Sequence, residues 1–241
     1  MTLQAGDTEF RNRFWIIGTS YGLGFVLYVF DKTSVAVYLA QRILGPFVNP
    51  DSYQSFDHAA RAIFALGTIL VLLAALIRSW ATAYLHSTVV HDADIHSERL
   101  LADGPYRYLR NPLYLGNILM AAGVGLLASR LGFLVIVLGN LIIVLRLIRR
   151  EEAGLLASQG ESYRRYYEAV PSLLPAFRPR VPAGSGQPNW RDGFFGESFV
   201  WGFVAGMAAF TVTLSLAWYG ALSGLGFAIY FVQNYLRSRN I

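Results

Sequence analysis

The sequence predicts an all-α protein, a polytopic transmembrane helical bundle of about six spans, and three observations lead to this fold class. Of the 241 residues, 54% are hydrophobic and only 15% are charged, whereas soluble domains usually carry about 25% charged residues. Apolar runs long enough to cross a bilayer recur along the chain, and such runs are typical of membrane helices. Arginine gathers between these runs rather than inside them, as expected for the water-facing ends of spans.

The N-terminal region, residues 1–98, contains the first two predicted spans. Phe14–Phe30 follows Arg11 and Arg13 as the apolar core of a signal peptide would, but it is long for such a core. No clear small-residue cleavage site comes after it, so we expect the segment to be retained as a span. A polar connector with two prolines leads to the second span, Ala59–Trp80.

The predicted core, residues 99–175, is organised around a helical hairpin. Leu113–Ala128 and Leu131–Ile148 are apolar and are joined only by Ser129-Arg130, so the two helices run antiparallel. The start of the third span and the end of the fourth therefore lie on the same membrane face. They are roughly 10 Å apart if the two helices pack directly against each other.

The hairpin begins at Asn111-Pro112, which is typical of a helix start with Asn at the N-cap and Pro at the first helical position. Such a start leaves unpaired backbone N–H groups, and Arg107 and Arg110 stand beside it in the sequence. Because N–H groups at a helix start and arginine side chains both bind anions, we expect a site for a carboxylate or a phosphate here.

Two carboxylates are predicted to face this helix start. Continuing the fourth helix beyond Ile148 puts Glu151 and Glu152 on one face with leucines. Acidic side chains at membrane depth are costly unless they are paired, and two interpretations stay open. The glutamates either form a salt bridge with Arg107 or Arg110, or they hold a polar ligand between the two helix ends.

A short interfacial helix is predicted after the hairpin. Gly160 ends the fourth helix, and Glu161–Val170 places tyrosines along one side, a pattern that suits the headgroup region of a membrane. Residues 176–196 are rich in Pro and Gly and predict a linker.

The C-terminal transmembrane region, residues 197–241, contains the last two predicted spans. Glu197–Trp218 is a fifth apolar run, and Ala221–Tyr235 is a shorter sixth one. We expect the chain to turn between them at Tyr219-Gly220.

The arginine distribution predicts the orientation of these spans. With six spans, nearly all arginines fall on the side of the two termini, and the other side holds only Lys32, Arg42 and Arg130. Because the side richer in Lys and Arg faces the cytoplasm, both termini and the Asn111 motif are predicted to be cytoplasmic. A five-span chain would put the C-terminal arginines outside and therefore ranks second.

Composition also limits the possible functions. The net charge is +5, but no basic run with interleaved aromatic residues is present, so nucleic acid is not an expected partner. Cysteine is absent, which excludes disulfides and a thiol nucleophile. His86, His91 and His96 follow at five-residue steps. They therefore do not share one helix face as metal ligands would, and no metal site is predicted.

The motifs together resemble a known family. From about Leu100 to Pro175 the chain shows, in order, Gly104–Gly116, the helical hairpin, Arg150-Glu151-Glu152, Tyr163–Tyr166 and Val170-Pro171. This series resembles the isoprenylcysteine carboxyl methyltransferase and phospholipid methyltransferase superfamily of integral membrane enzymes. The resemblance implies an S-adenosylmethionine site at the cytoplasmic membrane face without a Rossmann domain. The chain accordingly has no Gly-x-Gly-x-x-Gly after a strand pattern.

The parts of this cofactor can be matched with residues of the predicted core. Arg110 and the helix start suit its carboxylate, the two glutamates suit its ammonium group or ribose diol, and tyrosine rings suit its adenine. The predicted cofactor-binding residues are Tyr106, Arg110, Asn111, Pro112, Tyr114, Leu115, Glu151, Glu152 and Tyr163. Of these, Arg110 and Glu151 are also the predicted catalytic residues.

The methyl acceptor is expected to be a lipophilic small molecule or a lipidated molecule that enters from the surrounding membrane lipids. Carboxyl methyltransferase activity is the first choice by resemblance. Lipid N-methyltransferase activity is the closest alternative, because Asn111-Pro112 stands where the carboxyl methyltransferases generally show His-Pro.

The two acceptor classes need different protein groups. A carboxylate acceptor needs only orientation, for which Arg146, Arg149 or Arg150 would serve. An ammonium acceptor must first lose a proton, for which a glutamate or His96 is the candidate.

Two other classes of protein are weighed against a methyltransferase. Membrane sterol reductases resemble this hairpin architecture and use a nicotinamide cofactor, which makes them a more distant alternative. A channel or a structural membrane protein would need charged residues distributed through the spans, whereas here they gather at one face.

Overall fold

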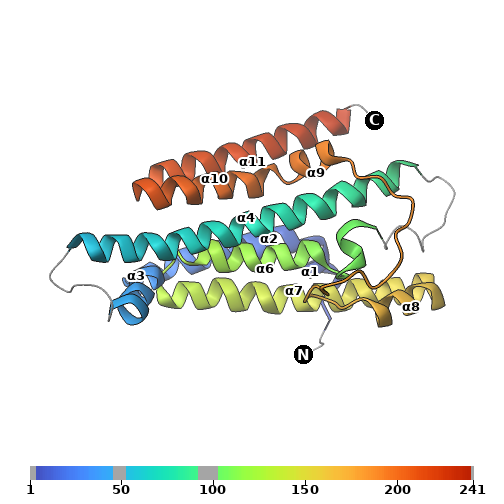
Figure 1. Ribbon diagram of the computed structural model, residues 1–241, viewed down its shortest axis with the longest axis horizontal. Helices are drawn as coiled ribbons and strands as arrows, with labels where there is room; N and C mark the ends of the chain where they lie inside the picture. Colours follow the sequence, from blue (N-terminus) through green and yellow to red (C-terminus); the bar gives the residue numbers. More distant parts are fainter. Residues whose placement is uncertain (1–3, 46–52, 92–102, 240–241) are drawn as a thin grey trace.

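The computed structural model describes residues 4–45, 53–91 and 103–239, and within them long helices run side by side as a bundle (Figure 1). The helices are α1 Asp7–Arg11, α2 Arg13–Val26, α3 Val35–Leu39, α4 Tyr53–His91, α6 Pro112–Gly125, α7 Arg130–Gln159, α8 Glu161–Ala169, α9 Trp190–Gly196, α10 Ser198–Thr213 and α11 Leu216–Arg239. The short helical turns are η1 Leu27–Val29, η2 Ala40–Leu44 and η4 Gly104–Arg107. The predicted all-α class is confirmed.

Each predicted span lies mainly in one helix, namely α2, α4, α6, α7, α10 or α11, although the first continues into η1 and the fifth runs past the end of α10 into α11. Three helical stretches in the described part of the chain are long and apolar enough to cross a membrane: Asp57–Leu85, Arg130–Gln159 and Leu216–Leu236. The pair α9 and α10, bent by 61°, makes a fourth if it is one broken span. The 14-residue helix α6 is only about 21 Å long, shorter than a hydrocarbon core of about 30 Å. The protein is therefore membrane-like, and the number of six spans stays a prediction.

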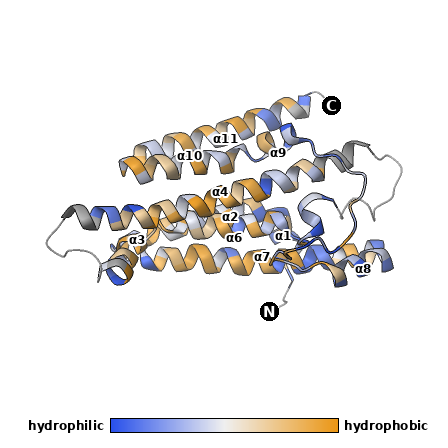
Figure 2. Cartoon of the chain, viewed as in Figure 1, coloured by the Kyte–Doolittle hydropathy of each residue, from blue (hydrophilic) through white to orange (hydrophobic). Residues whose placement is uncertain are grey.

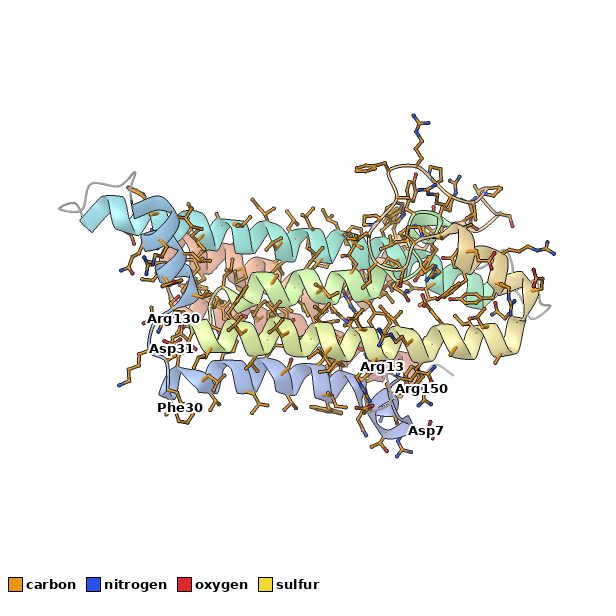
Figure 3. The ribbon with its side chains drawn as sticks, turned by 90° about the horizontal axis from the view of Figure 1, so that it is seen from below. Asp7, Arg13, Phe30, Asp31, Arg130 and Arg150 are labelled. Atoms are coloured by element: carbon orange, nitrogen blue, oxygen red, sulfur yellow. The ribbon has the colours of Figure 1, made fainter. Side chains whose placement is uncertain are left out.

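Polar residues gather at one end of the bundle. In Figure 2 the hydrophilic colours concentrate around α1, α8 and the coil that leads to α9, and α11 ends on the same side. Figure 3 shows Asp7, Arg13 and Arg150 at this end, with Phe30, Asp31 and Arg130 at the opposite end. We call the first of these the polar end. Its assignment to the cytoplasm stays a prediction.

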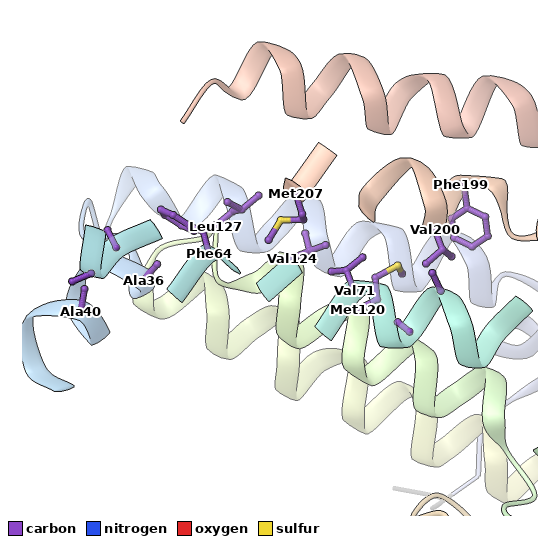
Figure 4. Close-up of a cluster of buried hydrophobic side chains, with 14 residues drawn as sticks. Ala36, Ala40, Phe64, Val71, Met120, Val124, Leu127, Phe199, Val200 and Met207 are labelled. Atoms are coloured by element: carbon purple, nitrogen blue, oxygen red, sulfur yellow. The ribbon is translucent and has the colours of Figure 1, made fainter. Parts of the chain in front are cut away.

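The central packing lies between α4, α6 and α10 (Figure 4). Val71, Val124 and Met207 are fully or almost fully buried there. Helices α4 and α6 approach closely because glycines face each other: a Cβ atom at Gly123 would lie 2.6 Å from the carbonyl oxygen of Gly67. Small residues at a contact allow helix backbones to approach in this way.

The predicted hairpin of α6 and α7 is present, and its connection is fixed by two local contacts. The Ser129 side chain caps α7 by accepting a hydrogen bond from the Gly132 N–H at 3.1 Å. Arg130 forms an ion pair with Asp31 at 3.0 Å, which ties the end of α2 and η1 to this turn. As predicted, α7 ends at Gly160, which has a positive φ of 59°.

The C-terminal region corrects two predictions. Helix α10 ends at Thr213 and α11 begins at Leu216, so the turn lies at Leu214, with φ 53°, and not at Tyr219-Gly220. The early end has a tertiary cause, because Arg61 of α4 donates to the carbonyl oxygens of Thr211 and Val212 and satisfies helix-end acceptors. In addition, α9 lies inside the predicted linker, so that segment is partly helical.

Gly202 lies at the tightest contact of the α10–α11 hairpin. A Cβ atom there would lie 2.8 Å from the Gly226 Cα atom, whereas a Cβ atom at Gly224 meets nothing within 4 Å. We expect Gly202→Val to lower the free energy of unfolding by about 1–3 kcal/mol or more, because overpacking forces the two helices apart. Denaturation in detergent measures this. Gly224→Val is the matched control, and an equal loss in both variants would contradict the close packing.

Candidate functional site

A cavity of about 910 Å³ lies at the polar end of the bundle and reaches along α6 between the other helices. Its volume is near the upper end of the range of about 300–1,000 Å³ for small-molecule sites. Side chains from α2, α4, η4, α6, α7, α8, α10 and α11 line it. The cavity therefore joins the predicted core with both flanking membrane regions.

The structure brings nearly all the predicted cofactor-binding residues to this cavity. Those that line it are Tyr106, Arg110, Asn111, Pro112, Tyr114, Glu151, Glu152 and Tyr163. Leu115 is the exception. Successive residues of a helix are rotated by about 100°, so the face of α6 that carries Leu113, Tyr114 and Asn117 into the cavity turns Leu115 away from it.

Glu152 is held by partners within the protein. The Arg110 Nε atom donates to its Oε1 atom at 2.8 Å, and the Asn111 amide donates to the same oxygen at 2.9 Å. Arg110 also donates to the Tyr167 carbonyl oxygen and stacks over the Tyr167 ring. Both side chains of the ion pair are about nine-tenths buried. The salt-bridge interpretation is therefore correct for Glu152, and this pair fastens α6, α7 and α8 together.

The backbone just before α6 is paired within the chain. The N–H groups of Arg110 and Asn111 donate to the carbonyl oxygens of Pro171 and Ser172, at 2.9 and 3.1 Å. The Asn111 side chain makes no capping hydrogen bond. Arg107 donates to the Val181 carbonyl oxygen and does not line the cavity. The coil after α8 thus covers the residues that precede the helix, and the anion site at the helix start stays a prediction.

Glu151 differs from its neighbour. Its Oε1 atom accepts a hydrogen bond from the Tyr114 hydroxyl at 2.9 Å. No ion pair within 4.0 Å reaches it from the described residues, and the positive charge of Arg13, another residue of the cavity lining, acts on it from a greater distance. A partly buried carboxylate without a paired cation favours a cationic ligand.

Tyrosines complete the polar end of the cavity. Tyr163 and Tyr166 are buried, with ring centroids 5.8 Å apart, and the Tyr166 hydroxyl donates to the Tyr106 carbonyl oxygen at 2.9 Å. Burial raises the pKa of the Tyr163 hydroxyl, and the nearby negative charge of Glu152 raises it further. This hydroxyl therefore stays neutral at physiological pH and can donate a hydrogen bond.

Sequence reasoning did not assign Arg78 to the site. Its Nε atom donates to Glu197 at 2.7 Å, and its Nη1 atom donates to the Asn117 side-chain oxygen at 2.6 Å. Arg78 fits against α6 because of Gly116, where a Cβ atom would lie 2.4 Å from the Arg78 Cγ atom. The sequence did contain one indication of this role, because Arg78 is an arginine close to an apolar run. Ionisable groups at membrane depth are paired and often functional.

The far wall of the cavity comes from the C-terminal hairpin and was also missed. Phe199 and Phe203 of α10 and Phe227 and Tyr230 of α11 line it, and their rings contact one another with centroids 5.3–5.6 Å apart. We call these four residues the aromatic wall. Nothing in the local sequence of an apolar helix indicates which of its aromatic residues faces a cavity.

The arginines proposed for a carboxylate acceptor do not line the cavity. Arg146 pairs with Glu9 at 2.7 Å and thereby lowers the pKa of that carboxyl group. Arg150 pairs with Asp7, at the outer surface of the polar end in Figure 3. Arg149 is absent from the lining as well, and His96 lies outside the described residues.

The fold and the cavity together define an integral membrane protein with a ligand site that is lined by both charged side chains and aromatic rings. Residues 62–159 match the family model described as phospholipid methyltransferase. This segment belongs to the isoprenylcysteine carboxyl methyltransferase and phospholipid methyltransferase superfamily, as the resemblance predicted. No curated protein and no solved structure matches the chain.

The matched segment covers only part of the cavity lining. It contains Arg78, η4, α6 and both glutamates of α7. It leaves out α2, Tyr163 and the aromatic wall. The family match therefore includes both glutamates and Arg78 but none of the aromatic wall.

Proposed function

We propose that this protein is a membrane methyltransferase that transfers a methyl group from S-adenosylmethionine to the amino group of a lipid. The observation that carries this proposal is Glu151, a carboxylate in the cavity whose hydrogen-bond partner is a hydroxyl group and not a cation. Of the four arginines that line the cavity, Arg78 and Arg110 are already paired with glutamates, and Arg11 and Arg13 are assigned below to the cofactor carboxylate. The site thus favours a cationic or amine acceptor over a carboxylate acceptor.

The polar end offers groups of the kinds that S-adenosylmethionine requires. The Glu152 Oε2 atom makes no hydrogen bond within the described residues and can accept from a ribose diol or an ammonium group. Tyr106 and Tyr163 provide rings for adenine, and Arg11 and Arg13 provide charge for the carboxylate. When bound, the cofactor supplies an electrophilic methyl group on its sulfonium.

The residues of the chain would then act by positioning and by proton removal. An ammonium group must lose a proton before its nitrogen can attack a methyl carbon, and Glu151 is the base within the cavity. Tyr114 holds the Glu151 carboxylate at its Oε1 atom, which leaves Oε2 for the acceptor. Arg110 is a positioning residue in this scheme, because it fixes Glu152 and not the reacting atoms.

The aromatic wall and the facing side of α2 would hold the apolar part of the acceptor. Gly18 lines the cavity, and a Cβ atom there would meet nothing within 4 Å. We expect Gly18→Leu to raise the KM for a long-chain acceptor about 15-fold to 60-fold, since the new side chain displaces two or three methylene groups worth about 0.8 kcal/mol each. The KM for S-adenosylmethionine should not change.

Gly22 provides the matched control for this measurement. It lies one turn further along α2, also has open space around its Cβ position, and is not part of the cavity lining. Gly22→Leu should leave both KM values unchanged. Equal effects of the two substitutions would show that the acceptor does not use this side of the cavity.

The proposed function is tested with the purified protein in detergent. Calorimetric titration with S-adenosylhomocysteine should show micromolar binding, while NADPH should not bind. Labelled methyl groups should then pass from S-adenosylmethionine to vesicles that contain an amine lipid, and not to vesicles with a prenylated cysteine carboxylate. Binding of NADPH alone would identify a reductase, and transfer to the carboxylate would reject the amine acceptor.

A further inference from the structure

The coil that follows α8 presents large apolar side chains to the surroundings of the protein. The Phe177 side chain is fully exposed, and Leu174 is 81% exposed. In Figure 3 this coil projects from the side of the bundle at the polar end. We call residues 174–180 the surface loop. Exposed apolar side chains with polar neighbours often mark a contact with another protein or with a membrane.

Backbone hydrogen bonds fix the surface loop to the segment around η4. The Ala176 N–H donates to the Tyr108 carbonyl oxygen at 3.0 Å, and the Arg180 N–H donates to the Arg107 carbonyl oxygen at 2.8 Å. Two prolines of the loop restrict its backbone further. The side chains between these bonds are therefore already held outward, which lowers the entropy that is lost when they bind a partner.

The lipid-facing side of α4 leads to this loop. Leu73 and Leu76 are exposed apolar residues on one face of α4, and Trp80 continues the row one turn later. The Trp80 ring lies 6.0 Å from the Tyr108 ring, and Tyr108 is the residue to which Ala176 bonds. Because Trp and Tyr prefer the boundary between hydrocarbon and headgroups, we place the surface loop at the depth of the lipid headgroups.

Both ends of the coil are fastened at the same depth. At its start, the Ser172 carbonyl oxygen accepts from the Asn111 N–H directly before α6. At its end, the Asn189 N–H donates to the Ala83 carbonyl oxygen at 2.9 Å, two residues before the apolar stretch of α4 ends at Leu85. The coil therefore follows the rim of the bundle and does not reach far into the water.

The charge of the surface loop is positive. Arg178 and Arg180 are exposed, and neither forms an ion pair within 4.0 Å in the part of the chain that the structure describes. The sequence has no acidic residue between Glu168 and Asp192. Apolar and cationic side chains thus stand together, which matches a bilayer surface that is apolar below and negatively charged above.

We infer that the surface loop binds anionic lipids of the bilayer in which the protein lies. Leu174 and Phe177 insert at the boundary of the acyl chains, and Arg178 and Arg180 extend to the charged headgroups. The loop lies outside the cavity lining, so this inference does not depend on the proposed reaction. An acidic protein partner would bind the same arginines without insertion of Phe177, and a measurement of insertion therefore separates the two.

The absence of cysteine from the chain allows a test at a single position. Phe177→Cys is labelled with a nitrobenzoxadiazole fluorophore in nanodiscs that contain phosphatidylglycerol and phosphatidylcholine. The emission should shift to the blue and should be quenched by spin labels on the lipid acyl chains. Ala157→Cys, exposed near the end of α7, is the control and should report water. Equal quenching at the two positions, or none at position 177, would overturn the inference.

The part of the lipid charge is tested in the same labelled protein. Each arginine near an anionic surface contributes about fivefold to binding. The ratio of inserted to water-exposed label should therefore fall about fivefold with Arg178→Gln and again with Arg180→Gln, and high salt should lower it as well. Arg164→Gln is the control, because Arg164 is exposed on α8 with Glu161 3.9 Å away. Insertion that is equal with and without phosphatidylglycerol would reject a preference for anionic lipids.

Discussion

Glu151→Gln is expected to abolish detectable methyl transfer while the protein stays folded and still binds S-adenosylhomocysteine. Glutamine keeps the size of the side chain and can still accept from the Tyr114 hydroxyl, but it cannot take a proton from an ammonium group. Loss of a positioned base lowers a rate about 100-fold to 10,000-fold. The measurement is the initial rate of transfer of labelled methyl groups to an amine lipid, together with calorimetric binding of S-adenosylhomocysteine.

Glu161→Gln is the control for this experiment. Glu161 is exposed at the start of α8, with Arg164 and Arg165 at 3.9 and 3.8 Å, and exposed pairs of this kind contribute little. The control should keep its activity. If Glu151→Gln keeps the wild-type rate, Glu151 is not the base. If it instead loses S-adenosylhomocysteine binding, the carboxylate belongs to the cofactor site.

Substitutions that break the Arg110–Glu152 ion pair are expected to have the largest effect on the stability of the protein. Glu152→Ala or Arg110→Ala alone should lower the free energy of unfolding by about 3–5 kcal/mol, because each leaves one buried charge without its partner. The double substitution Arg110→Met with Glu152→Leu should cost much less than the sum, because it leaves neither charge buried. Chemical denaturation in detergent, followed by tryptophan fluorescence, measures all three.

Arg107→Ala is the matched control, since within the described part of the chain the Arg107 side chain bonds only to a backbone carbonyl in the coil. Its effect should be about 1 kcal/mol or less. If the single substitutions cost no more than this control, the ion pair is not a structural element. The comparison also shows why loss of cofactor binding in Glu152→Ala would not by itself prove a contact with the cofactor: the same change loosens α8 and the start of α6.

Local sequence patterns were sufficient to predict the helices and motifs that form the framework of the site. The tight link at Ser129-Arg130 predicted the α6–α7 hairpin, and Gly160 predicted the end of α7. Helical periodicity then placed Glu151 and Glu152 on the face that meets the start of α6. The motifs between Gly104 and Pro171 predicted the family to which the matched segment belongs. These features depend on neighbours within a few turns of one helix or on an ordered series of short motifs.

The partners of the charged groups could not be predicted in the same way. Arg110 was predicted to bind a ligand carboxylate, but it is occupied by Glu152 and by carbonyl oxygens of the chain after α8. Arg78 binds Glu197, which is 119 positions away in the sequence. Either arginine could pair with several acidic residues, and only the packing of the helices selects one.

The sequence by itself determined the membrane class, the order of the helices, the hairpin and the two glutamates on its inner face, because hydropathy and helical periodicity are local properties. Only the tertiary structure decided where α10 ends, since Arg61 of α4 satisfies the last carbonyl groups of that helix. It also decided that α2 and the aromatic wall close the cavity. A cavity is formed by side chains from distant segments, and its shape depends on how helices pack rather than on how each one forms.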